Sequence, residues 1–375
     1  MVKRVNRQSV KQSASGRSFW RSIRKSVFAA ALTWICVQLA AHHAGWVERW
    51  YSHGIYPTLA SWLSAASRMV VFSLDDLFYV FLLLFGLIVI VLAVLRRMKF
   101  RTALRLVICT LCWTYVAFYW LWGMNYFREG LNQRLDIKHR LSSEKVLDDV
   151  TAAMIDHANH MQEHLDFLQR GTIDSLIESS YCHLASFLQI SYPGGTRRAK
   201  TITFSRFFAQ AGISGYYGPF FSEIHVNRQV LLIEYPFVLA HEKAHQFGIT
   251  SEAEANFYAW MACRYSGDYA LAYSADLGVL PYLFQEIRSP DKRIQLLARI
   301  HPAVRNDFRR ISTHWRKLRN KKVDHYASKI NDSYLKANHV QRGIRDYTGV
   351  VRFIIDFETD STALRQVKMM TIKTN

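Results

Sequence analysis

Two long runs of apolar residues in the first third of the chain carry no charged side chain. The first extends from Leu77 to Leu95 and the second from Leu106 to Met124, where aromatic residues become frequent towards Trp122. A helix of about 20 apolar residues crosses the hydrocarbon core of a bilayer, and Trp and Tyr gather at the membrane interfaces. The pattern therefore predicts transmembrane helices at about 77–95 and 106–124.

A third apolar run, at about 27–44, is weaker because it contains Gln38 and ends near a pair of histidines. A cleavable signal peptide and a buried core helix are the alternatives for this run. The basic segment before it is long for the start of a signal peptide, and Trp46 and Trp50 resemble interface anchors. We therefore predict that it is retained as a third span.

Beyond the spans, the pattern predicts an α+β domain that is mostly helical. Segment 45–76 mixes aromatic and small residues, which favours an amphipathic helix along the membrane surface. Apolar residues recur at spacings of three and four between about 143 and 170, as on one face of a helix. The basic segment from about 291 is also predicted to be mostly helical.

Three stretches of this domain are predicted to form strands, at 200–208, 223–230 and 347–357. The second alternates apolar and polar residues and lies shortly before a candidate metal motif. The exposed edge of a strand in that place could hold an extended peptide through main-chain hydrogen bonds.

The formal net charge of +19 would suggest nucleic-acid binding if it were evenly spread. Instead, many of the lysines and arginines lie before residue 26 and between residues 96 and 105, and neither segment contains an acid. Basic loops stay on the cytoplasmic side of a membrane. The sequence therefore predicts a basic cytoplasmic tail at 1–26, a membrane domain at 27–125 and an extracytoplasmic domain at 126–375, with no nucleic-acid partner.

The five cysteines carry little information about fold or function. Cys109 and Cys112 lie inside a predicted span, where packing is the simplest role. Cys182 and Cys263 would face an oxidising compartment, so a disulfide between them is an open alternative.

His241-Glu242-Lys243-Ala244-His245 has the form His-Glu-x-x-His. Residues four apart lie on one face of a helix, so both imidazoles can bind one ion. Glu242 lies next to that face, where it can act as general base on a zinc-bound water whose pKa is lowered to about 7. The motif predicts a catalytic zinc site that still lacks its third protein ligand.

Two glutamates compete to be that third ligand. Gly248 can end the first helix in a left-handed conformation, and a second helix is predicted to begin near Glu252. Ser251 and Glu254 have the spacing of a capping box, which gives Glu254 a structural role. We therefore favour Glu252 as the ligand, with Asn256 one turn later on the same face to hydrogen-bond a ligand histidine.

Other polar residues near the motif have less specific interpretations. His225 lies on the predicted strand and could approach the metal, although a packing or surface role is favoured. Tyr216 and Tyr217 could stabilise an oxyanion, but adjacent aromatic residues more often pack. The residue that stabilises an oxyanion therefore stays unassigned.

The stretch "HEKAHQFGITSEAEANF" resembles the gluzincin metallopeptidases, whose HExxH precedes a Glu-x-x-Ala-Asp/Asn on the next helix. The resemblance implies His241, His245 and Glu252 as zinc ligands, Glu242 as base, and Asn256 beside a ligand. The gap before the third ligand is short, as in metzincins, but the third metzincin histidine would fall on Ser251, which excludes that class.

Further stretches, such as "FYWLWGMNYFREG" and "GISGYYGPFFSEIHVN", are similar to an uncharacterised family of bacterial multi-pass membrane proteins, domain of unknown function family 3810. That family has a predicted metallopeptidase domain. The resemblance covers most of the chain and implies three transmembrane helices followed by an α+β, mostly helical, zincin-like domain.

These observations favour a membrane-anchored zinc (Zn²⁺) metallopeptidase in the bacterial cytoplasmic membrane, with its N-terminus in the cytoplasm. Its expected partners are membrane lipid and a peptide or protein substrate in or near the cell envelope. The alternative is a non-catalytic scaffold or envelope assembly factor with a structural or vestigial zinc site. The sequence does not indicate the substrate, the regulation or the oligomeric state.

Overall fold

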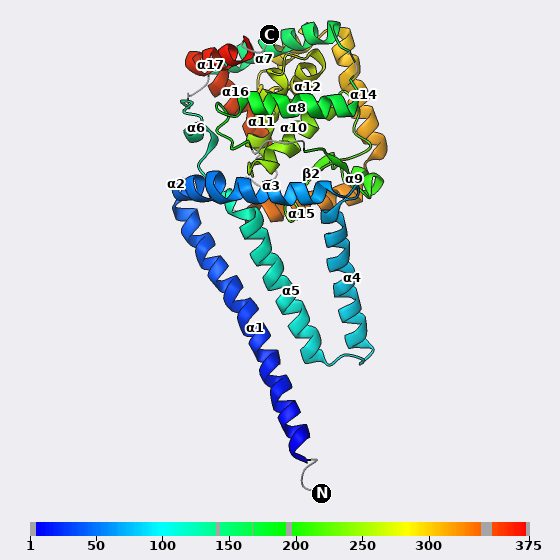
Figure 1. Cartoon of the computed structure of the whole chain (residues 1–375). Helices are drawn as coiled ribbons and strands as arrows, with labels where there is room; N and C mark the ends of the chain where they lie inside the picture. Colours follow the sequence, from blue (N-terminus) through cyan, green and yellow to red (C-terminus); the bar gives the residue numbers. More distant parts are fainter. Residues whose placement is uncertain (1–4, 140–142, 167, 193–196, 339–346, 373–375) are drawn as a thin grey trace.

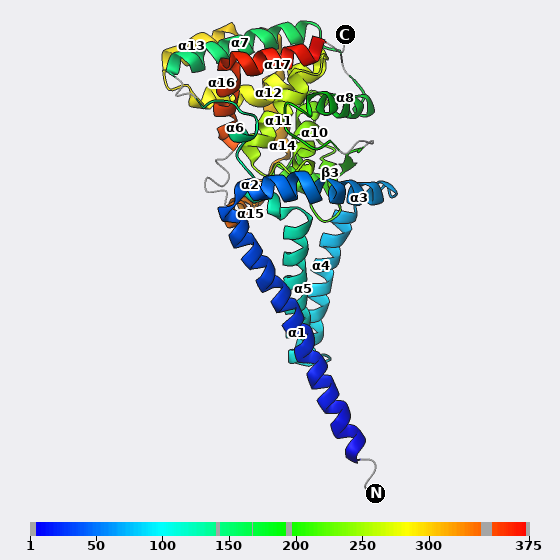
Figure 2. The same ribbon diagram turned by 60° about the vertical axis from the view of Figure 1, so that its left-hand side comes forward.

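Three long helices extend from one side of a mostly helical body in the computed structural model (Figures 1 and 2). The structure describes residues 5–139, 143–166, 168–192, 197–338 and 347–372. The N-terminus lies at the far end of the longest helix, and the C-terminus lies on the opposite side of the body (Figure 1).

The long helices are α1 (Val5–His42), α4 (Leu74–Val94) and α5 (Phe100–Leu121), and both α1 and α4 pack against α5. Each contains a segment long and apolar enough to cross a membrane: Arg21–His42, Leu74–Val94 and Phe100–Leu121. The three predicted spans therefore coincide with helices. The basic tail, as far as it is described, is helical and continuous with the first span.

The second of these helices has clear ends. Ser73 accepts a hydrogen bond from the N–H of Asp76 and caps the start of α4. At the other end Arg96, with φ 55°, makes the turn towards α5. This basic link lies at the end of the helices that is remote from the body, as the N-terminus does (Figure 1).

A crosswise segment connects α1 to α4 and lies between the long helices and the body (Figures 1 and 2). It contains α2 (Ala44–Trp46), the π-helical η1 (Val47–Ile55) and α3 (Tyr56–Arg68). Tyr51 and Tyr56 are buried on one face, whereas Trp50 and Trp62 are exposed. The predicted amphipathic helix is thus present in this segment.

A three-stranded sheet lies beside the crosswise segment, with strands β1 (Lys200–Thr201), β2 (Gly215–Gly218) and β3 (Glu223–Val226). Its order is β1-β3-β2, with β1 parallel and β2 antiparallel to β3. The strand predicted at 223–230 therefore ends at Val226 and is central, so the prediction of an exposed edge there was wrong. The strand predicted at 200–208 is also mostly wrong, because α9 (Ser205–Gln210) follows β1.

The rest of the body is helical and is built around α11, whose Phe257, Trp260 and Met261 are fully buried. A short turn, η2 (Gly123–Phe127), and α6 (Leu131–Arg134) lead from the third long helix into the body. The main helices are α7 (Glu144–Glu163), α8 (Arg170–Leu184), α10 (Tyr235–Gln246), α11 (Glu252–Arg264), α12 (Tyr269–Glu286), α13 (Pro290–Arg299), α14 (Pro302–Leu318), α15 (Lys321–Ala337), α16 (Val350–Thr359) and α17 (Ser361–Ile372).

The strand predicted at 347–357 is wrong, because most of this segment forms α16. Val350, Phe353, Ile354 and Phe357 are all buried there. A continuous apolar run has no clear period, so periodicity alone does not separate a buried strand from a buried helix. Packing against α11 and α12 decides in favour of the helix.

Candidate metal centre

Two consecutive helices, α10 and α11, carry the residues of the predicted metal site. Gly248 has φ +79° and ends α10 in the left-handed conformation, as expected from the sequence. Ser251 caps α11 by accepting a hydrogen bond from the N–H of Glu254, which is also as expected. The short turn between these residues brings the start of α11 beside the end of α10.

The side chains of His241, His245 and Glu252 converge at this junction. The Nε2 atoms of the two histidines lie 3.1 Å apart. Oε2 of Glu252 lies 3.1 Å from Nε2 of His241 and 3.6 Å from Nε2 of His245. Tetrahedral zinc with bonds of about 2.0–2.1 Å separates its ligand atoms by about 3.3 Å. The three atoms therefore already have the spacing of one face of a zinc tetrahedron.

The second nitrogen of each imidazole is held by another acceptor. Nδ1 of His241 lies 2.8 Å from Oδ1 of Asn256, and Nδ1 of His245 lies 2.6 Å from the carbonyl oxygen of Ile249. A proton on each Nδ1 satisfies these acceptors and leaves Nε2 as a lone-pair donor. Metal-binding histidines are oriented in this way in proteins.

The electrostatics of the group favour a cation at its centre. Burial raises the pKa of the Glu252 carboxyl, but the two imidazoles beside it lower the pKa further, to well below its usual value. Burial lowers the pKa of His245, whereas the neighbouring Glu252 raises it to about 9. The buried carboxylate thus stabilises positive charge beside it, which a metal ion would supply.

Glu242 lies next to this group and is buried. A Cβ atom added to Gly215 would lie 2.6 Å from Oε1 of Glu242, so this carboxyl lies against the start of β2. Burial raises the pKa of Glu242 to about 7, although the nearby His241 and His245 lower it. The carboxyl of the HExxH motif is therefore close both to the metal group and to β2, one of the two edge strands of the sheet.

Lys243, the residue after Glu242, is completely buried. Its Nζ lies 2.5 Å from Oε1 of Glu178 and 2.6 Å from Oδ1 of Asp174, both on α8, and it donates to the carbonyl of Arg197. These ion pairs hold the motif helix against α8. This role could not be predicted from the sequence, because Glu178 lies 65 positions before Lys243 in the chain.

Glu254 does not approach the metal group. Its carboxylate pairs with Arg134 and accepts a hydrogen bond of 2.9 Å from the N–H of Leu131. The carboxylate therefore holds α6 rather than completing a capping box with Ser251, although its exclusion as a ligand agrees with the geometry.

Two residues just beyond the end of α5 contact the motif helix and the turn after it. The indole N–H of Trp122 donates to the carbonyl of His245 at 3.0 Å, and its ring meets the imidazole edge-on. Arg128 donates to the carbonyl of Gly248 at 3.1 Å and pairs with Glu48 of the crosswise segment. Trp122 is therefore buried just beyond α5, which ends at Leu121, whereas the sequence predicted a span that reaches Met124.

Tyr347 is a residue of the centre that the sequence did not reveal. Its ring is parallel to that of His241 with centroids 6.5 Å apart, and burial together with the nearby carboxylates of Glu252 and Glu242 raises the pKa of its hydroxyl. Its carbonyl also faces the amide of Asn256. The residue falls at the start of the segment mistaken for a strand, where no local signal marks it.

Three other residues that were considered lie outside the metal group. The Tyr216 hydroxyl pairs with Asp76, and the Tyr217 hydroxyl donates to Ser222 at 3.1 Å. His225 is fully buried and lies 2.7 Å from the Ser73 hydroxyl. All three contribute to packing around the sheet.

The candidate disulfide is not formed in the structure. Cys182 is exposed, Cys263 is buried, and both are free.

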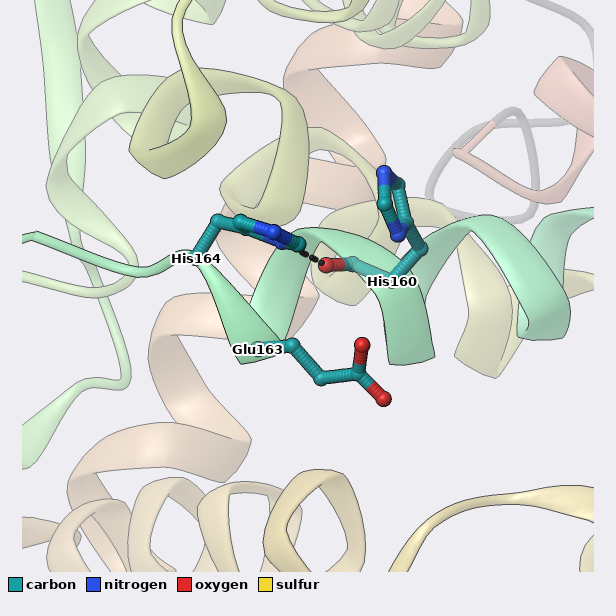
Figure 3. A group of neighbouring side chains, drawn as sticks. All are labelled: His160, Glu163 and His164. Carbon is teal, nitrogen blue, oxygen red and sulfur yellow. Dashed lines mark hydrogen bonds between the residues drawn. The ribbon is translucent and has the colours of Figure 1, made fainter.

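A second group of possible metal ligands lies on the surface at the end of α7, with His160, Glu163 and His164 all exposed (Figure 3). Its residues follow one another as His-x-x-Glu-His, which is the reverse of the His-Glu-x-x-His order in the buried motif. Nδ1 of His164 lies 3.1 Å from the carbonyl oxygen of His160, and its ring stacks on Tyr269. Sequence reasoning overlooked this group.

The fold and the site define a class: a mostly helical protein with three helices long and apolar enough to cross a membrane and with a buried His-His-Glu group that could hold a metal ion. The chain belongs to the family described as "Protein of unknown function (DUF3810)", whose model matches residues 51–355. No curated protein and no solved structure matches it. The family resemblance is thereby confirmed, whereas the likeness to gluzincins stays a prediction.

Proposed function

We propose that the protein is a membrane-anchored zinc-dependent hydrolase, and most simply a peptidase. His241, His245 and Glu252 hold the ion, and Glu242 is the general base. The observation that carries this proposal is the spacing of the two Nε2 atoms and Oε2, 3.1 to 3.6 Å, with both Nδ1 atoms engaged elsewhere. A bound zinc ion would polarise a carbonyl and supply a water of pKa about 7.

The residues around the ion can bind and cleave an extended peptide. β2 is an edge strand, and its first residue, Gly215, touches Glu242. A peptide that adds to this edge by main-chain hydrogen bonds would pass beside the Glu242 carboxylate. Glu242 would take a proton from the attacking water and deliver it to the leaving amine. Tyr347, whose ring lies parallel to that of His241, would help to keep this ligand in place.

The three apolar helices support insertion into the bacterial cytoplasmic membrane. Both basic segments lie at the end remote from the body, which favours a cytoplasmic N-terminus and an extracytoplasmic body. Trp122 and Arg128, just beyond the third helix, contact the motif directly. The substrate would therefore be a peptide or protein segment close to the membrane surface of the cell envelope.

The test is quantitative terminal proteomics on cell envelopes that carry either the wild-type protein or the Glu242→Gln variant. Glu163→Gln, in the exposed group, is the matched control. We expect a set of new termini to disappear in Glu242→Gln alone, while its zinc content, measured by elemental analysis, stays unchanged. Zinc retention with full complementation of a deletion by Glu242→Gln would instead favour the non-catalytic scaffold.

A further inference from the structure

Helix α15 buries Leu335 against the body but leaves two other large side chains exposed. Tyr326 and Ile330, one turn apart on the same face, are 66% and 71% exposed. On the inward side, Asp324 and Asn331 are partly covered. A helix at a water-facing surface normally covers side chains such as Tyr326 and Ile330, because burial of apolar surface is favourable. Something other than water is expected to cover the outer face of α15.

The C-terminal end of α15 lies at the outer end of the third candidate span. The ring of Tyr334 meets that of Phe118 at 6.2 Å, and its hydroxyl accepts a hydrogen bond from Tyr126. The hydroxyl of Tyr119 donates to Asn338 at 3.1 Å. Phe118 and Tyr119 belong to the last turn of α5, which ends at Leu121. Helix α15 is therefore level with the place where the span leaves the bilayer, and Figures 1 and 2 show it beside the crosswise segment.

Helix α9 continues this surface towards the second candidate span. The N–H of Asn320, which caps α15, donates to the carbonyl of Gln210 at the end of α9. Phe204 and Phe207 are both more than half exposed. The N–H of Thr203 donates at 2.9 Å to Asp76, in the first turn of α4. The exposed phenylalanines thus begin beside the outer end of another span.

The charges along α15 suit a lipid surface. Lys322, Lys329 and Lys336 follow one another at intervals of one heptad, and all three are exposed. They form a stripe next to Tyr326, about a quarter of a turn from Ile330, and Lys336 also pairs with Asp332 of the same helix. Lysines that flank aromatic and aliphatic residues are typical of helices in the membrane interface, where they extend towards anionic headgroups.

We propose that α9 and α15 form a lipid-binding collar, in which Phe204, Phe207, Tyr326 and Ile330 enter the outer leaflet and the lysines meet anionic phospholipid headgroups. The collar lies at the level of the crosswise segment (Figures 1 and 2). The proposal rests on the membrane placement proposed above, and not on catalysis. It fixes the body, and with it the metal centre, close to the lipid surface.

The test uses the full chain in liposomes that contain phosphatidylglycerol, with the native cysteines replaced by alanine. A nitroxide at Ile330→Cys or Phe207→Cys is compared with one at Ile294→Cys on α13, which is similarly exposed but belongs to the part of the body remote from the long helices (Figure 2). Accessibility to oxygen, relative to a water-soluble nickel chelate, reports depth in lipid. We expect this ratio to be several-fold higher at residues 207 and 330 than at residue 294.

A label at Leu83→Cys in α4 separates this inference from the membrane placement on which it rests. If Leu83 is in lipid while residue 330 has the accessibility of residue 294, the collar is wrong and the span stands. If residue 330 is shielded from both oxygen and nickel, with spin–spin broadening between copies, a second copy of the chain covers α15 and the collar is again wrong. If the ratio of oxygen to nickel accessibility at Leu83 is as low as at residue 294, both the membrane placement and the collar are wrong. In liposomes of phosphatidylcholine alone, the ratio at residue 330 should fall, because the lysines lose their anionic partners.

Discussion

The two groups of His and Glu side chains in this protein have nearly the same composition and differ in construction. In the buried group, His241 and His245 come from one helix and Glu252 from the next. In the exposed group, His160 and His164 belong to a single helix end (Figure 3). The buried group therefore keeps its shape through tertiary structure, whereas the exposed one consists of three water-exposed side chains from a single helix end.

The surroundings of the imidazoles differ in the same way. Nδ1 of His241 is held by Asn256 on another helix, whereas Nδ1 of His164 meets the carbonyl of its own preceding turn. The first arrangement fixes the direction of Nε2 before an ion arrives, so little entropy is lost on binding. A His-x-x-x-His pair alone does not define a metal site. The groups behind the imidazoles do, and the following predictions test this difference.

The largest effect is expected for ligand removal. His245→Ala leaves two ligands of the buried group, so the purified protein should lose its stoichiometric zinc. His164→Ala is the matched substitution in the exposed group and should leave the zinc content unchanged. Elemental analysis after exhaustive dialysis measures both. Zinc that survives in His245→Ala but disappears in His164→Ala would reverse the assignment of the two groups.

Next in size is the effect of the ion pairs that hold the motif helix. Lys243→Met leaves Glu178 and Asp174 without their buried cation and should lower the free energy of unfolding by about 3–5 kcal/mol. The control is Arg299→Met beside the exposed group, where the pair with Asp156 is solvent-exposed and its loss should be undetectable. Thermal unfolding of the detergent-solubilised protein compares the two variants. Equal shifts in both would show that Lys243 does not hold the motif helix.

The parts of the centre that the sequence predicted are those with local signals. The spacing of His241 and His245, the left-handed turn at Gly248 and the cap at Ser251 each depend on neighbours within a few residues, and all appear in the structure. The three long helices were predicted in the same way, because the length of each apolar run can be read directly from neighbouring residues. Glu252 reaches the group because the turn before it is short.

The parts that the sequence missed depend on distant partners. Lys243 meets acids of α8, and Glu254 is taken by Arg134, 120 positions earlier in the chain. Trp122 closes a predicted span that is rich in aromatic residues, yet its indole N–H donates to the carbonyl of His245 in the body. Such pairings follow from how whole helices pack, which hydrophobic periodicity does not encode.

A smaller effect, which depends on pH, is expected for the ion pair of Glu48 with Arg128, called the clamp because Arg128 also holds the carbonyl of Gly248 after the motif. Burial raises the pKa of Glu48, but Arg128 and His53 lower it further, from 4.5 to about 2. A carboxyl with a lowered pKa stabilises the fold fully above its unfolded pKa, and this contribution, up to about 3 kcal/mol, is lost as the pH falls from about 4.5 to 2. Glu48→Gln should therefore unfold at a lower temperature than wild type at neutral pH.

The difference between the two unfolding temperatures should close as the pH falls below about 4.5. Because wild type and Glu48→Gln share the metal ligands, protonation of those ligands cancels in the comparison. Glu163→Gln, in the exposed group, should follow the wild-type curve at every pH. A constant gap between wild type and Glu48→Gln would mean that the clamp is not an ion pair.

The smallest effect concerns the orientation of one imidazole. Asn256→Ala removes the acceptor of His241 Nδ1 but no ligand, so zinc should still bind, about 10–100-fold more weakly. Asn256→Asp keeps an acceptor there and should restore the affinity, which a merely structural role would not predict. Competition with a chelator measures all three proteins, with Asn159→Ala, beside the exposed group, as the control. If Asn256→Ala binds zinc as tightly as wild type, Nε2 of His241, Nε2 of His245 and Glu252 alone define the centre. The buried and exposed groups would then differ only in where the third ligand lies.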